Sequence, residues 1–225
     1  MMSPKPFTTS TQVSPFATAE VTTKQYKPWL DFDDGKNVLF TSVHLFDNYH
    51  NHPGVFYPGT GAESENTPQD DACYPGGIQN VPLPPGECSS AQWRQAFAEK
   101  VFPRLQEFKP DFILCSAGFD AHCKDHLHRS GDTGVTEFDY RWLTENLQRI
   151  ANTHAQGRLV SCFEGGYNVR HWHQSVLAQS VGAHIRALAV TSSSKLIINE
   201  KWNEIEKFTR EENDRRVLES RELMF

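Results

Sequence analysis

Short apolar runs alternate with amphipathic segments through the middle of the chain. Apolar and β-branched residues gather in runs of six to eight that predict β-strands. Between these runs, apolar residues recur every three to four positions, which predicts helices that bury one face. This alternation predicts an α/β fold, a parallel sheet with flanking helices. The predicted strands are 37–44, 112–117 and 158–163, and the predicted helices start at Ser89 or Ser90, at Thr136 and near Trp172.

Local signals define these elements more closely. Residues 112–117 are almost uninterruptedly apolar, which is typical of a strand covered on both faces. Thr136 with Asp139 three residues on predicts a capping box. The helix that ends at Val190 is predicted to turn four residues inward: Val176, Val181, Ile185 and Leu188.

The segments outside this alternation differ in character. Residues 1–27 are rich in Ser, Thr and Pro and are predicted to be disordered. Residues 46–85 are rich in Gly, Pro, Asn and Asp, which predicts a long functional loop. Residues 193–225 predict a charged C-terminal helix with an apolar edge, and residues 28–192 hold the folded domain between.

Composition narrows the function classes. Of 225 residues, 38% are hydrophobic and 22% charged, and the net charge of −6 argues against direct binding of nucleic acid. We expect no membrane span, because the apolar runs are too short. Five cysteines without a CxxC pair argue against a disulfide framework and against a cysteine zinc site.

Candidate chemistry follows two predicted strands. Ligands bind at the carboxyl ends of strands in open parallel sheets. Asp120 follows one strand and offers a carboxylate, and Tyr167 follows another and offers a phenol that can donate to an oxyanion. Gly165 and Gly166 allow the backbone to approach a ligand closely. The alternative for each is structural: an aspartate in this position also caps helices or closes turns.

The order and spacing of several motifs are more specific than any one of them. They are SAGFDAH (116–122), DYRWLTENL (139–147), GRLVSCFEGGYN (157–168), VLFTSVH (38–44) and VFYPGTG (55–61). Together they resemble the C-terminal half of the histone deacetylase and acetylpolyamine amidohydrolase superfamily, in its class II-like form. The resemblance implies an arginase/deacetylase-like fold, here truncated at its N-terminal half, with one zinc ion at the strand ends.

The resemblance also implies roles for individual residues. Asp120 matches a zinc ligand of that family, and Tyr167 matches the phenol that stabilises the tetrahedral intermediate. Tyr57 and Leu127 match residues that line the substrate tunnel, together with Gly165 and Gly166. Ser42 matches a contributor to a monovalent cation site, which implies K⁺, whereas the neighbouring His44 is expected to be structural.

Two family motifs have no match in the chain. These are the paired histidines that act as general acid and base, and the D-x-H segment that supplies the other zinc ligands. Asp31 or Asp33 could mimic a ligand, but no histidine accompanies them. Three histidines lie close to Asp120 in the sequence: His122, which forms a D-x-H sequence with it, His126 and His128. One hypothesis is that they replace the missing zinc ligands, and the other is that they are solvent-facing loop side chains.

Two functions therefore stay open at this point. One is a zinc-dependent deacetylase, incomplete and impaired as written, acting on acetyl-lysine of histones or other proteins or on acetylated polyamines. The other is a non-catalytic deacetylase-like remnant that binds or regulates. A sheet without its other half should also expose apolar surface, which predicts a protein partner that covers it. The resemblance implies a location in the nucleus, the cytoplasm or both.

Overall fold

The computed structural model describes residues 8–14, 17–22, 34–46, 59–67, 77–86, 88–127, 133–171, 174–191 and 211. Near the N-terminus, strands β1 (Thr8–Ser14) and β2 (Ala17–Thr22) pair antiparallel. These two strands lie within the segment predicted to be disordered, and the disorder of residues 1–27 stays a prediction. Both strands are rich in threonine and valine, whose branched Cβ favours extended backbone, a signal outweighed in the prediction by the Ser/Thr/Pro composition.

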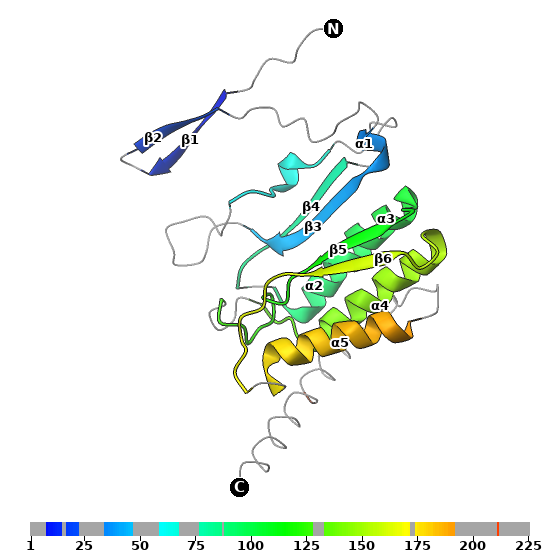
Figure 1. The fold of residues 1–225 in the computed structure, drawn as a ribbon. Coiled ribbons are helices and arrows are strands. Elements are labelled where there is room, and N and C mark those ends of the chain that lie inside the picture. Colours follow the sequence, from blue (N-terminus) through cyan, green and yellow to red (C-terminus); the bar gives the residue numbers. More distant parts are fainter. Residues whose placement is uncertain are drawn as a thin grey trace.

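Two parallel strand pairs carry the domain (Figure 1). Strand β3 (Leu39–Leu45) pairs with β4 (Gly77–Leu83), and β5 (Ile113–Ala117) pairs with β6 (Leu159–Phe163). The parallel α/β architecture is thereby confirmed. Strand β4 was missed, because it lies inside the segment predicted to be a long loop. Its polar residues and Pro82 are unfavourable for a central strand. In Figure 1, β4 lies on the side of its pair away from β5.

The helices follow the predicted order (Figure 1). Two short ones precede the main set, α1 (Asp34–Asn37) and the 3₁₀ turn η1 (Glu63–Glu65). The first amphipathic helix consists of α2 (Ser90–Ala96), the π-helical turn η2 (Phe97–Val101) and α3 (Phe102–Phe108). Ser89 caps it through the Gln92 N–H, and Lys109 ends it in the left-handed conformation. The later helices are α4 (Glu137–His154) and α5 (Val176–Val190).

The predicted capping box at Thr136 is confirmed, and it belongs to a buried polar network. Asp139, completely buried, accepts hydrogen bonds from the backbone N–H and the hydroxyl of Thr136 at 2.7 and 3.0 Å. Its other oxygen accepts from Ser90 and from the buried guanidinium of Arg94, both at 2.5 Å. The network therefore ties the start of α4 to α2, with Arg94 lying over the ring of Trp142.

The core lies on one side of the strands. Phe102, Trp142 and Ile150 are buried there against the inward residues of β5, Ile113 and Ala117. Among the described helices none is long and apolar enough to cross a membrane. On α5, Ala183 and Ala187 face the core instead of Ile185, so the predicted inward position of Ile185, which is 56% exposed, is wrong.

The face of the strands opposite the core is exposed to solvent. Leu114 is 64% exposed, Phe40 53% and Val160 46%, although each stands in an apolar run. The expectation that residues 112–117 would be covered on both faces is therefore wrong for the structure described. An apolar run indicates which faces a strand can bury. Among the described elements, helices pack against only one face of these strands.

Candidate functional site

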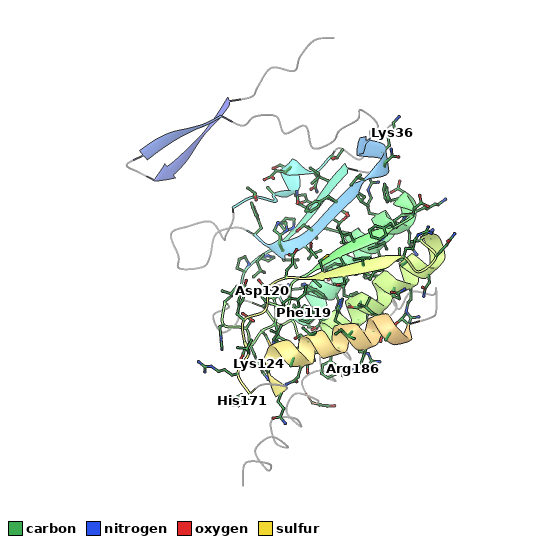
Figure 2. The ribbon with its side chains drawn as sticks, in the orientation of Figure 1. Lys36, Phe119, Asp120, Lys124, His171 and Arg186 are labelled. Atoms are coloured by element: carbon green, nitrogen blue, oxygen red, sulfur yellow. The ribbon has the colours of Figure 1, made fainter. Side chains whose placement is uncertain are left out.

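The loops after β5 and β6 meet at the carboxyl ends of these strands, where the sequence predicted a site. The Phe119 N–H donates to the Gly165 carbonyl at 2.8 Å, and the Glu164 N–H donates to the Ala117 carbonyl at 3.0 Å. These bonds continue the strand pairing into the loops. Asp120 and Phe119 lie at this end of the strands in Figure 2.

Two glycines make room for the carboxylate of Asp120. A Cβ built at Gly165 would lie 2.6 to 2.8 Å from the three carboxyl atoms of Asp120, and one at Gly118 would lie 2.9 Å from its Oδ1. A side chain at Gly165 would therefore push the carboxylate away. The sequence predicted only that Gly165 allows a close approach of the backbone. The structure shows that this approach brings two loops, distant in the sequence, together at the Asp120 carboxylate.

Gly166 is required for a second reason. Its backbone has a φ of 133°, and an added Cβ would collide with Leu177 and press against Phe119. It thereby allows the loop to turn directly before Tyr167. The phenol ring that follows is about half exposed, so it is accessible to a ligand.

Asp125 fixes the position of Tyr167 through the backbone. This carboxylate is only 4% exposed. One oxygen accepts from the backbone N–H groups of Tyr167 and Asn168 at 2.7 and 3.2 Å, and the other accepts from the Leu127 N–H at 3.0 Å. The Asn168 side chain adds a bond to the Lys124 carbonyl at 2.7 Å. Sequence reasoning missed Asp125, whose only signal was an acidic residue in a loop next to Asp120.

His122 does not join Asp120 in a metal site, and it does not face solvent. It is buried, and its Nε2 lies 3.3 Å from the equally buried carboxylate of Glu137. Burial, together with the Lys124 N–H facing Nδ1, favours the neutral ring. Hydrogen bonds to Cys123 and Glu137 outweigh these effects and raise the pKa of His122 to about 8. The solvent-facing prediction is therefore wrong for His122, which is structural.

Tyr140 packs beneath the loop that follows β5. Its ring packs edge-on against Phe119, with ring centres 5.1 Å apart. Burial, followed by the charges of Asp120 and Asp139, raises the pKa of Tyr140 well above its ordinary value. The hydroxyl therefore stays protonated, and the motif that contains it provides packing under the site.

Ser42 and His44 lie on β3 and support a different loop. The Ser42 hydroxyl lies 2.9 Å from His44 Nδ1, and His44 Nε2 lies 3.0 Å from the Gly61 carbonyl. Since a carbonyl only accepts, Nε2 carries the proton and Ser42 donates to Nδ1. His44 is structural, as expected, and its ring occupies the space that a Cβ at Gly61 would fill. The monovalent cation site at Ser42 stays a prediction.

The remaining predicted residues are placed as follows. Leu127 is 61% exposed at the end of the Asp125 loop, and His126 is exposed beside it. Tyr57, Asp31, Asp33, His128 and the C-terminal helix over 193–225 lie outside the described residues, apart from Glu211. The tunnel roles of Tyr57 and Leu127 therefore stay predictions.

A zinc ion does not fit the described residues on their own. Zinc sites in proteins use three or four protein ligands. Across the described part of the chain, no group of three or more His, Cys, Asp or Glu side chains is arranged to hold a metal. Asp120 is therefore a single candidate ligand.

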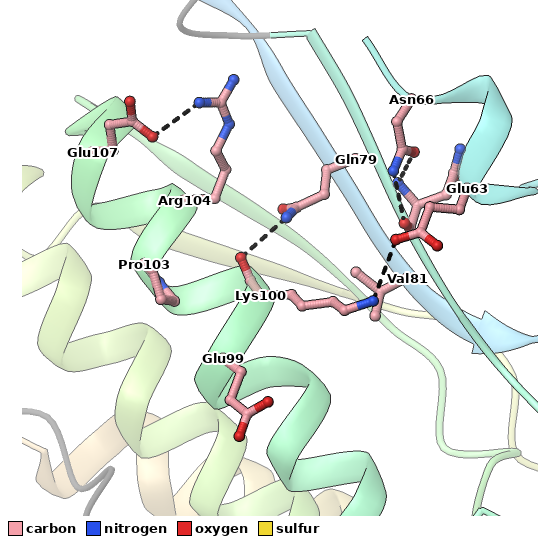
Figure 3. A pocket seen from close by; sticks show the side chains of 10 residues that line it. Glu63, Asn66, Gln79, Val81, Glu99, Lys100, Pro103, Arg104 and Glu107 are labelled. Carbon is pink, nitrogen blue, oxygen red and sulfur yellow. Dashed lines mark hydrogen bonds and ion pairs between the residues drawn. The ribbon is translucent and has the colours of Figure 1, made fainter. Parts of the chain in front are cut away.

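A cavity of about 520 Å³ lies away from this site, between β4, η1 and the π-helical turn (Figure 3). Its charged side chains are partly paired with one another. Lys100 lies 3.4 Å from Glu63, and Arg104 lies 3.0 Å from Glu107. The chemistry predicted from the sequence is not located there, so we assign this cavity no function.

The fold is that of an α/β protein whose adjoining strand-end loops carry Asp120 and Tyr167, the residues at which the sequence predicts a ligand site. Comparison with known proteins makes the class specific. The histone deacetylase domain model matches residues 31–184, and the chain belongs to the histone deacetylase family.

Its relatives are class II-type deacetylases. Type-2 histone deacetylase 2 of Dictyostelium discoideum is 33% identical over 68% of this chain, and Histone deacetylase 14, chloroplastic, of Arabidopsis thaliana is 37% identical over 71%. The crystal structure of the HDA15 HD domain superposes with a TM-score of 0.54 at 31% identity over 72% of this chain. The chain spans only 8% and 36% of those two relatives and 41% of that solved chain.

Proposed function

We propose that this chain supplies part of the active site of a zinc-dependent deacetylase that acts on acetyl-lysine of histones or other proteins. One observation carries the proposal. The loops after β5 and β6 bring Asp120 against Gly165 and leave the ring of Tyr167 accessible two residues further on. An acidic group and a phenol thus stand on two adjoining loops at the strand ends, where α/β folds bind ligands.

The two side chains have different roles in the proposal. The Asp120 carboxylate is one metal ligand, and the other ligands come from outside the described residues. The Tyr167 hydroxyl donates a hydrogen bond to the amide oxygen as negative charge develops on it. Asp125 is a positioning residue, because it holds the backbone of Tyr167 and Asn168.

A second candidate function is a non-catalytic deacetylase-like module that binds or regulates. It is favoured by the described part of the chain, in which no group of three or more His, Cys, Asp or Glu side chains is arranged to hold a metal and Asp120 is a single candidate ligand. Acetylated polyamines are the alternative substrate class for the catalytic proposal. We place the protein in the nucleus, the cytoplasm or both, in keeping with its family, although one relative is named as chloroplastic.

The test is hydrolysis of an acetyl-lysine peptide in the presence of zinc. The chain is assayed alone and co-expressed with the part of the HDA15 HD domain that it does not match. We expect turnover only after co-expression, and a loss of at least about 100-fold in Asp120→Asn. Glu164→Gln, which changes a neighbouring exposed carboxylate, is the matched control and should retain activity. Turnover that is equal in Asp120→Asn would contradict the proposal, and no turnover in any combination would favour the non-catalytic module.

A further inference from the structure

A buried histidine of α5, His184, is hydrogen-bonded at both ring nitrogens. Its Nδ1 lies 2.7 Å from the Thr144 hydroxyl oxygen on α4, and its Nε2 lies 2.8 Å from the Ser161 hydroxyl oxygen on β6. The Thr144 hydroxyl donates its one proton to the Tyr140 carbonyl at 2.6 Å, so it accepts from Nδ1. Nε2 then has a lone pair and accepts from Ser161. These bonds therefore hold the ring in its neutral form, with the proton on Nδ1.

The same ring packs against Phe119, which directly precedes Asp120. The two rings meet edge-on with their centres 5.4 Å apart, and Phe119 is only 3% exposed. The Phe119 N–H donates to the Gly165 carbonyl at 2.8 Å, and this bond joins the Asp120 loop to the loop that carries Tyr167. His184 therefore supports the contact between the two loops through one side chain.

A positive charge on this ring would have to be stabilised by water. Both nitrogens are bonded to uncharged hydroxyl groups, and burial alone lowers the pKa of His184 below its ordinary 6.5. Tyr140 on α4 and Cys115 on β5 are uncharged at neutral pH, because burial raises the pKa of each. The ionised residues closest in sequence to the contacts of the ring are Asp120, Glu145, Arg158, Glu164 and Arg186, and none of these five is bonded to it.

Phe119 is the wall of this site that can move to admit water. Thr144 and Ser161 stand on α4 and β6, whose backbones are held by helix and strand hydrogen bonds, whereas Phe119 stands on a loop. Loops open locally at a lower free energy than core helices and strands do. Protonation of His184 therefore favours a form in which Phe119 has moved away and its bond to Gly165 is broken.

We propose that His184 is a positioning residue for the Asp120 loop, which it holds in place as a neutral ring and releases when it is protonated in mildly acidic solution. This inference deepens the proposed function and rests on it for the roles of Asp120 and Tyr167. The opened ring has the ordinary pKa of 6.5 and the buried ring a lower one. The closed loop is therefore fully favoured above pH 6.5, and this advantage is lost as the pH falls through the folded-state pKa.

The experiment is amide exchange of this chain, followed by NMR at several values between about pH 7.5 and about pH 5.5. Each rate is compared with the intrinsic rate at the same pH, which gives a protection factor. We expect the protection factor of the Phe119 N–H to fall at least about threefold over this range. Low concentrations of urea should change it little, because local opening exposes little surface. The factor of Ala151, completely buried in α4, should fall as urea is added, because its exchange requires global unfolding.

A pair of variants assigns the change to one ring. His184→Gln keeps a donor and an acceptor but takes up no proton in this range, and the control His154→Gln removes a histidine at the end of α4. We expect the pH dependence of Phe119 protection to disappear in His184→Gln and to be kept in His154→Gln. If circular dichroism shows that His184→Gln does not fold, the measurements on the unmodified chain still decide.

Three results would overturn the proposal. They are a protection factor of Phe119 that is constant with pH, a Phe119 amide that shares the urea dependence of Ala151, and a pH dependence that persists in His184→Gln. None of these readouts uses turnover. A chain with the acid response but without hydrolysis would therefore contradict only the proposed function, and hydrolysis without the acid response would contradict only this inference.

Discussion

Replacing Asp125 by asparagine should detach the Tyr167 loop from the Asp120 loop. The carboxylate accepts three backbone N–H groups and is almost completely buried. A hydrogen bond to a charged group contributes roughly 1.5 to 3 kcal/mol and one to a neutral group roughly 0.5 to 1.5 kcal/mol. An asparagine can accept through only one oxygen, so at least one of the three bonds is lost and the others weaken. We expect the free energy of unfolding to fall by about 3 to 4 kcal/mol.

Urea unfolding at low protein concentration measures this loss, and amide exchange locates it. The N–H groups of Tyr167 and Asn168 should exchange much faster in Asp125→Asn than in the unmodified chain. The control is Asp111→Asn, the same substitution at an exposed aspartate, which should change stability by less than about 0.5 kcal/mol. If Asp125→Asn unfolds like the control and both amides keep their protection, the claim that Asp125 positions Tyr167 is refuted.

Three further predictions concern stability and association. Asp139→Asn weakens the pairing of the buried Arg94 guanidinium and should lower the free energy of unfolding by about 3 kcal/mol; a loss below about 1 kcal/mol in urea would contradict the network. Burial lowers the pKa of His184 below its ordinary 6.5, so stability present above pH 6.5 should be lost as the pH falls through the folded-state pKa. The change should disappear in His184→Gln, and persistence would assign it to another group. Exposed Leu114 should promote self-association, so Leu114→Lys should reduce light scattering at high concentration; unchanged scattering would assign association to another surface.

The elements that depend on local signals could be predicted from the sequence. Thr136 and Asp139 predicted the start of α4, because a capping box is a contact between near neighbours in the chain. The apolar run before Asp120 and the Gly-Gly turn before Tyr167 predicted two loops at one edge of a sheet. Both loops are adjacent in the structure.

The features that the sequence did not predict depend on contacts between residues that are distant in the chain. Strand β4 was missed because it contains polar residues. They are compatible with a strand here because Asn66 and Thr67 form hydrogen bonds with its outer edge, and the sequence of β4 does not indicate these partners. The direction of Ile185 was predicted wrongly because a helix with apolar residues on several sides has no unique inward face. His122 looked like a loop histidine because its partner, Glu137, lies fifteen residues further along the chain.

The central claim is that Tyr167 donates a hydrogen bond to the reacting amide, and Tyr167→Phe tests it most directly. The variant removes one hydroxyl that is about half exposed, so the fold should be kept. In the chain co-expressed with the unmatched part of the HDA15 HD domain, kcat for an acetyl-lysine peptide should fall by about 100-fold or more while KM changes little. An unchanged kcat, or a loss that appears only in KM, would contradict the account.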